Sequence, residues 1–102
     1  MEQPDALIHQ PLRLKIMATL RALPPREQLE FVRLKALVGA TDGNLGAHLT
    51  TLEQAGYLET TKEFDNKKPR TRVRLTPAGR RAFAAYVEFL REIVDGNQSG
   101  GR

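Results

Sequence analysis

Short side chains that can hydrogen-bond to base edges gather on one face of a single stretch, residues 41–59. This face is free of lysine and arginine and holds Gly43, Asn44, Gly46, Ala47, Thr50, Thr51 and Gln54. Small side chains let a helix backbone approach the floor of a DNA major groove, where amide and hydroxyl groups meet donors and acceptors on the bases. The stretch therefore favours recognition of double-stranded DNA. A neutral helix face turned to solvent is the alternative.

The same stretch carries the signals of a helix that begins at Thr41 and ends near Ala55. The Thr41 hydroxyl can cap free amides of the first turn, and Asp42 places negative charge at the positive end of the helix. Three leucines at helical spacing predict a core face: Leu45, Leu49 and Leu52. Gly56 is suited to the left-handed conformation that commonly terminates a helix.

Other kinds of chemistry have little support in the composition. The chain has no cysteine, which excludes disulfides, thiolate zinc sites and a cysteine nucleophile. His48 lies at the edge of the leucine stripe without a second ligand nearby, so packing or a phosphate contact is favoured over metal binding. Thr50 and Thr51 lack a base that would activate them, and the acidic residues form no recognisable catalytic pair. We expect no enzymatic activity, no metal site and no cofactor.

Positive charge is concentrated in one segment, residues 66–81. The formal net charge is +4, yet this segment contains seven basic residues and no acidic one, while the rest of the chain holds nine basic and twelve acidic residues. Two strand-like runs, YLETTKEF and RTRVRLT, flank the turn cluster DNKKP, whose proline is expected to prevent ladder pairing there.

This pattern predicts a β-hairpin with arginines along one face of its second strand. Alternation places Val73 and Leu75 on one face and Arg70, Arg72 and Arg74 on the other. Four cations are predicted to contact the phosphate backbone: Lys67, Lys68, Arg70 and Arg72. A charged edge strand that resists aggregation is the alternative.

The remaining elements are expected to support the helix over residues 41–55. Residues 1–10 form an N-terminal extension without clear periodicity, and Pro11 begins a core helix that runs to about Ala22. A very short strand near residues 29–31 leads into a second helix over residues 31–38. Its inward residues are predicted to be Phe31, Leu34, Leu37 and Val38. Two short helices joined by a glycine-bearing turn are a helix-turn-helix pattern.

The last helix, residues 77–95, has an apolar face too wide for one small core. A second copy of the chain is the simplest cover, so we expect a homodimer. Its interface is predicted to comprise Leu7, Ile8, Phe83, Tyr86, Phe89, Leu90 and Ile93. The glycine-rich residues 96–102 are expected to be a disordered tail.

Length and composition fit one domain, over residues 11–95. The chain has 102 residues and is 40% hydrophobic, enough for a modest core. Neither a membrane-spanning run nor a signal-peptide pattern is present in the sequence, and we expect a cytoplasmic protein.

Three segments carry a resemblance to a known group: LRLKIMATL, FVRLKALVGATDGNLGAHLTTLEQAGYLE and KPRTRVRLTPAGRRAF. Together, over residues 9–94, they resemble small single-domain winged helix-turn-helix transcriptional regulators related to the MarR and ArsR families. The resemblance implies a mainly α fold with a β-hairpin. It also implies that the helix over residues 41–55 enters the major groove, that the hairpin over residues 57–75 lies on the backbone or minor groove, and that terminal helices dimerise.

The resemblance also implies which residues would contact DNA. On the recognition helix they are Thr41, Asp42, Gly43, Asn44, Ala47, Thr50 and Thr51, to which the residues alone add a phosphate contact by His48. The cysteine pair of ArsR metal sensors is absent, because Leu37, Val38 and Gly39 stand in that region. An effector, if there is one, is not indicated. A winged-helix module that binds another protein rather than specific DNA remains the alternative function.

Overall fold

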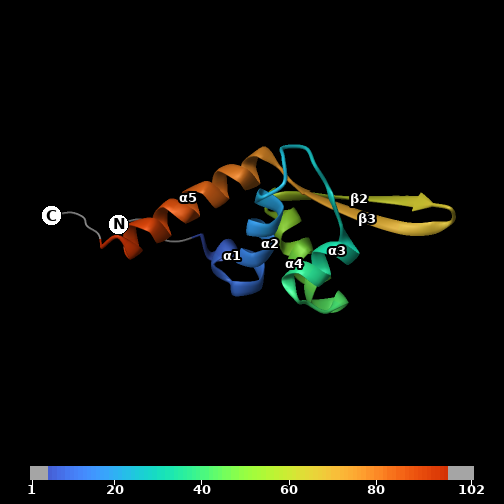
Figure 1. The fold of residues 1–102 in the computed structure, drawn as a ribbon, viewed down its shortest axis with the longest axis horizontal. Coiled ribbons are helices and arrows are strands. Elements are labelled where there is room, and N and C mark those ends of the chain that lie inside the picture. The colour runs from blue at the N-terminus through green and yellow to red at the C-terminus, as the bar shows by residue number, and fades with distance from the viewer. Residues whose placement is uncertain (1–4, 97–102) are drawn as a thin grey trace.

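The computed structural model describes residues 5–96, which form five helices and a small sheet. The helices are α1 (Ala6–His9), α2 (Pro11–Arg21), α3 (Phe31–Val38), α4 (Asp42–Gln54) and α5 (Pro77–Val94). The strands are β1 (Leu29–Glu30), β2 (Leu58–Asp65) and β3 (Lys68–Leu75). The hairpin β2–β3 projects from one side of the helical body and α5 from the other, which gives a longest extent of 60 Å (Figure 1). The predicted tail comprises residues 96–102. Apart from Gly96, it lies outside the described residues.

The core lies where α2, α3 and α4 meet the base of the sheet. The three leucines of α4 are buried as predicted, and Ile16, Met17 and Leu20 of α2 pack in the same cluster. Three buried strand residues, Leu58, Val73 and Leu75, close it from the sheet. The alternating and helical spacings of the apolar residues thus predict most of the core correctly.

Two helices begin at threonine caps, as the sequence predicts. Thr41 Oγ1 accepts a hydrogen bond from the Asn44 N–H at 3.2 Å, and Thr76 Oγ1 accepts one from the Gly79 N–H at 3.0 Å. The turn between α3 and α4 is tight because Gly39 adopts a φ of 70°, which L side chains rarely adopt. These local signals fix the helix-turn-helix geometry.

The sheet has the strand order β1-β3-β2, and both neighbouring pairs are antiparallel. The turn between β2 and β3 consists of Asn66 and Lys67, with φ values of 53° and 66°, as a type I′ turn requires. Pro69 was expected to stop pairing, but it lies within β3 opposite Phe64. In such a hairpin the pair Asp65 and Lys68 exchanges hydrogen bonds and the next pair does not, so Pro69 costs no bond to β2.

The N-terminal segment is ordered by contacts that the sequence did not predict. Residues 6–9 form α1, and the Asp5 carboxylate caps it by accepting from the Leu7 N–H at 2.9 Å. Asp5 also accepts a hydrogen bond from the Tyr57 hydroxyl at 2.6 Å, which together with burial raises the pKa of Tyr57 to about 12. The His9 ring lies against the Tyr86 hydroxyl, with Nδ1 and oxygen 2.8 Å apart.

Burial corrects three predictions about apolar residues. Ile8 and Tyr86, predicted at a dimer interface, are buried inside the protomer because α1 folds back onto α2 and α5. The side chains of Ile8 and Tyr86 therefore do not lie on the outer surface of the protomer. Leu37, predicted to face inward, is 53% exposed, because it is turned about 100° from Val38 around α3.

Helix α5 begins in close contact with the start of β2. Gly79 is buried there, and a Cβ atom at this position would lie 1.9 Å from the carbonyl oxygen of Tyr57. The Thr76 N–H donates to that same carbonyl at 3.1 Å. Only glycine lets α5 cross the chain this closely. None of the helices within residues 5–96 is long and apolar enough to cross a membrane.

Candidate nucleic-acid interface

The outer face of α4 is open to solvent. Most of the predicted reading residues are exposed there, namely Thr41, Asp42, Gly43, Asn44, Ala47 and Thr50, whereas Thr51 is half-buried. Asp42 is tied to Lys35 of α3 by an ion pair with nitrogen and oxygen 2.7 Å apart. The remaining exposed residues combine small size with amide or hydroxyl groups, which matches the requirement for close approach to base edges.

The polar groups on this face retain hydrogen-bonding capacity. The Thr50 and Thr51 hydroxyls donate to the carbonyl oxygens of Gly46 and Ala47 at 3.0 and 3.2 Å, which leaves their lone pairs to accept. The Asn44 side chain forms no hydrogen bond with any residue in the described part of the chain, because its part in the cap is played by its backbone N–H. Its amide can therefore both donate and accept.

His48 faces the body of the domain. Its Nδ1 atom accepts a hydrogen bond from Arg13 Nε of α2 at 3.1 Å. Burial, followed by the charge of Arg13, lowers the pKa of His48 below its ordinary value, so the ring is neutral at neutral pH. His48 therefore contributes to packing between α4 and α2, one of the two roles predicted for it. Within residues 5–96, no group of three or more potential ligands is placed to hold a metal ion.

The C-terminal end of helix α4 is hydrogen-bonded to β2. The Glu53 carboxylate accepts from the Thr60 N–H at 3.2 Å and from the Thr60 hydroxyl at 3.0 Å. A groove of about 240 Å³ separates α4 from the sheet beyond this contact. It is lined by Phe31, Gly46, Leu49, Thr50, Glu53, Thr60, Lys62 and Thr71. One face of the hairpin is thus turned toward α4.

The strand register divides the hairpin into two faces. The near face is turned toward α4 and contains Leu58, Thr60, Lys62 and Phe64 of β2 with Pro69, Thr71, Val73 and Leu75 of β3. The far face contains Glu59, Thr61, Glu63 and Asp65 of β2 with Lys68, Arg70, Arg72 and Arg74 of β3. Directly opposed residues point to the same side of an antiparallel pair. The predicted separation of the arginines from Val73 and Leu75 is therefore confirmed.

The far-face arginines are paired with carboxylates. The guanidinium of Arg74 lies 2.6 Å from Glu59, and that of Arg72 contacts Glu63. Arg70 lies 2.6 Å from Glu30, and this contact is the main reason that its pKa is raised. The arginines line one face of β3 as predicted, but in the folded protomer each lies beside a carboxylate from elsewhere in the sequence. Glu59 and Glu63 are an even number of residues apart and so share one face of β2, a signal that would have revealed two of these pairs.

Three lysines of the hairpin are left as free cations. Among the described residues, none of Lys62, Lys67 and Lys68 takes part in an ion pair, and all three are exposed. Lys67 and Lys68 were predicted from their place at the tip. Lys62 was missed, although its two-residue spacing from Thr60 places it on the near face. Free positive charge therefore lies at the tip and on the side that faces α4.

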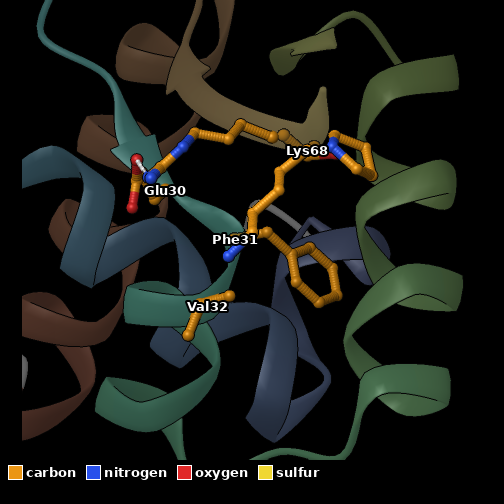
Figure 2. Close-up of a pocket in the computed structure, with 7 residues that line it drawn as sticks. Glu30, Phe31, Val32 and Lys68 are labelled. Carbon is orange, nitrogen blue, oxygen red and sulfur yellow. Dashed lines mark hydrogen bonds and ion pairs between the residues drawn. The ribbon is translucent and has the colours of Figure 1, made fainter. Parts of the chain in front are cut away.

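A second hollow, of about 410 Å³, lies between the start of α3 and β3 (Figure 2). Phe31 and Val32 contribute apolar side chains to its lining, and Glu30, at its edge, forms an ion pair with Arg70. The hollow marks the place where β1 has ended, since β1 pairs only with Arg72 and Val73. Lys68 is its only lining residue in the described chain with an unpaired positive charge.

Comparisons with known proteins agree with this geometry. A family model described as a winged helix DNA-binding domain matches residues 12–94. An uncharacterized protein of Methanocaldococcus jannaschii is 38% identical over 82 residues, which cover 80% of this chain and 86% of that protein. The structure of a transcriptional regulator homologue from Pyrococcus horikoshii OT3 matches with a TM-score of 0.79 and 31% identity, over 88% of this chain and 86% of that chain.

A more distant solved structure supports the fold alone. A transcriptional regulator of the MarR family from Silicibacter pomeroyi matches with a TM-score of 0.66 and 24% identity, over 91% of this chain and 62% of that chain. The predicted fold class and the resemblance to winged-helix regulators are confirmed by these matches. The chain belongs to the winged helix DNA-binding domain family.

Proposed function

We propose that this protein is a sequence-specific transcriptional regulator that binds double-stranded DNA as a homodimer. Helix α4 enters the major groove, and the hairpin β2–β3 lies along the backbone or in the minor groove. The single observation that carries the proposal is the exposed face of α4, where Gly43, Asn44, Ala47 and Thr50 combine small size with unused hydrogen-bonding capacity. Membership of a DNA-binding family supports it independently.

Affinity for the phosphate backbone would come from the free lysines. Lys67 and Lys68 lie at the hairpin tip, and Lys62 lies on the near face, so all three can approach phosphates that flank the site read by α4. Arg70 and Arg72 contribute less than expected from the sequence, because each is held by a carboxylate.

Dimerisation would use the end of α5 that extends away from the body. Ile93 and Val94 are 53% and 81% exposed, and Phe89 beside them is half-buried. The predicted residues Leu7, Phe83 and Leu90 are also half-buried and can complete the interface. Two-fold symmetry then places recognition helices on half-sites about 34 Å apart, or a multiple of that distance.

The alternative function, binding of another protein without specific DNA recognition, is favoured by the charge balance of the far face. Selection of bound duplexes from a random pool distinguishes the two. A regulator enriches a site with two-fold symmetry, and its affinity for that site falls as salt is raised. Recovery of no enriched sequence, together with the absence of any salt-sensitive shift of duplex DNA, would reject the proposed function.

A further inference from the structure

Phe64 is an apolar residue in an unusual place, at the tip of the hairpin. Phe64 is 79% exposed. The register places it on the near face, directly opposite Pro69. Within the described residues its ring makes no aromatic contact, since the ring pairs there involve His9, Tyr86 and Phe89. The fold of the protomer therefore makes little use of this ring.

The surroundings of Phe64 are cationic. Lys62 lies two residues earlier on the same face, about 7 Å away along the strand. Lys67 and Lys68 follow at the turn, and both are exposed and free of ion pairs in the described chain. An apolar ring framed by lysines fits a partner that offers negative charge around an apolar crevice.

The carboxylates nearby are directed to the other side of the hairpin. Glu59, Glu63 and Asp65 belong to the far face, where Glu59 and Glu63 hold Arg74 and Arg72, and Asp65 lies 3.2 Å from Arg70. The near face at the tip therefore presents Phe64, Pro69 and Lys62 without an acidic neighbour on that face. The near face is therefore the side of the hairpin tip that is suited to contact a polyanion.

The minor groove of DNA has the chemistry that this tip requires. Phosphates line its two edges, sugars form apolar walls, and apolar side chains can enter between base steps and partly unstack them. The groove is about 6 Å wide, which admits a ring carried on a narrow two-stranded tip. A flexible pyrimidine–purine step opens at the lowest cost.

We propose that Phe64 enters the minor groove as an apolar wedge that partly unstacks one base step. Lys67 and Lys68 then lie on the flanking phosphates, and Pro69 packs on the sugar wall beside the ring. The proposal rests on the proposed function. It adds a residue that selects DNA sequence by how easily one base step is deformed. It predicts a pyrimidine–purine step at a fixed distance from the bases contacted by α4.

The test uses the full chain and its selected duplex, with 2-aminopurine substituted at successive positions of each flank. The fluorescence of this base rises when it loses stacking. We expect the wild-type protein to raise it at one step on each flank, and Phe64→Ala to abolish the rise and weaken binding about tenfold. Phe64→Leu, which keeps an apolar wedge, should restore part of both effects. The slope of affinity against salt should be the same for all three proteins.

Two controls keep the outcomes distinct. Val32→Ala removes another exposed apolar side chain, 70% exposed on α3 and outside the proposed DNA-binding and dimer surfaces, and it should leave the fluorescence rise unchanged. Equal melting temperatures of Phe64→Ala and the wild type would show that folding is intact. If the wild type binds its site but Phe64→Ala gives the same fluorescence and affinity, the wedge is wrong and the proposed function stands. If the wild type binds no duplex, both fail.

Discussion

Arg13 of α2 donates a hydrogen bond from Nε to Nδ1 of His48, and this bond joins α4 to the body of the domain. The bond requires an unprotonated Nδ1, so its presence depends on the charge of the imidazole ring. Arg13 also donates to the Leu7 carbonyl oxygen at 3.3 Å. One guanidinium group thus connects α4, α2 and the N-terminal segment.

The first prediction concerns the pH dependence of stability. The pKa of His48 is lowered in the folded protein, so the unfolded chain binds this proton more readily. The stability contributed by neutral His48 is present above about pH 6.5 and is lost as the pH falls through the lowered pKa. Urea unfolding from about pH 8 to about pH 5 should show a steeper loss for the wild type than for His48→Gln, which keeps a neutral acceptor. Parallel curves would contradict the prediction.

The second prediction assigns base reading to Asn44. Its side chain is not needed by the cap, which uses its backbone N–H, so Asn44→Ala should leave the melting temperature unchanged. Loss of a paired contact with adenine should cost about 1–3 kcal/mol on the selected site and little on random DNA. Thr41→Ala is the matched control, because it removes the cap and should lower stability by about 0.5–2 kcal/mol. A lower melting temperature with unchanged specificity for Asn44→Ala would contradict this assignment.

The third prediction separates free from paired cations in the hairpin. Each phosphate contact contributes a slope of about −0.9 to log affinity against log salt. Replacing Lys67 and Lys68 together by alanine should therefore flatten the slope by about 1.8, on every sequence alike. Arg74→Gln should change the slope little, because Glu59 already neutralises Arg74. If Arg74→Gln flattened the slope more than the double lysine substitution, DNA would have to displace Glu59 from Arg74.

The fourth prediction concerns the crossing of α5 over the chain at Tyr57. Gly79→Ala should destabilise the fold by about 1–3 kcal/mol or more, because the added Cβ has no room. Gly43→Ala is a useful comparison, since a Cβ there meets nothing within 4 Å. In α4 it should raise stability by about 0.5–1 kcal/mol. Thermal unfolding measures both changes, and a neutral Gly79→Ala would show that the contact relaxes easily.

The fifth prediction concerns the oligomeric state. Light scattering at micromolar concentration should find a dimer of the wild type. The double substitution of Ile93 and Val94 by aspartate should give a monomer, because charge would be buried in the interface. Val32→Asp, at a site 70% exposed on α3, is the control and should stay dimeric. A monomeric wild type would reject the proposed homodimer.

Features set by local sequence could be predicted. Thr41 and Thr76 cap their helices because the signal lies within three residues of the amides they satisfy. Alternation in β3 correctly placed Val73 and Leu75 on the core side. The family resemblance supplied the arrangement of these elements around α4, which periodicity alone does not specify.

Features that depend on distant residues were missed. Glu30 and Arg70 are 40 positions apart, and their ion pair depends on where β1 ends. The contact of His9 with Tyr86 joins residues 77 positions apart and draws Tyr86 into the protomer. The sequence shows that the apolar face of α5 is wide. It does not show which part of that face is covered by α1 within the same protomer. Charge concentrated in one segment of the sequence likewise did not predict the charge of a surface.

Pro69 has a consequence for how the hairpin behaves beside other chains. On the side away from β2, β3 is paired only at Arg72 and Val73, so the residues nearer the tip form an open strand edge in the described structure. Such an edge invites another polypeptide to add a strand, which is how sheets grow into fibrils. Pro69 withholds the amide that an incoming strand would need, and Lys68 beside it repels another basic hairpin. This edge of β3 is therefore protected from serving as a template for aggregation.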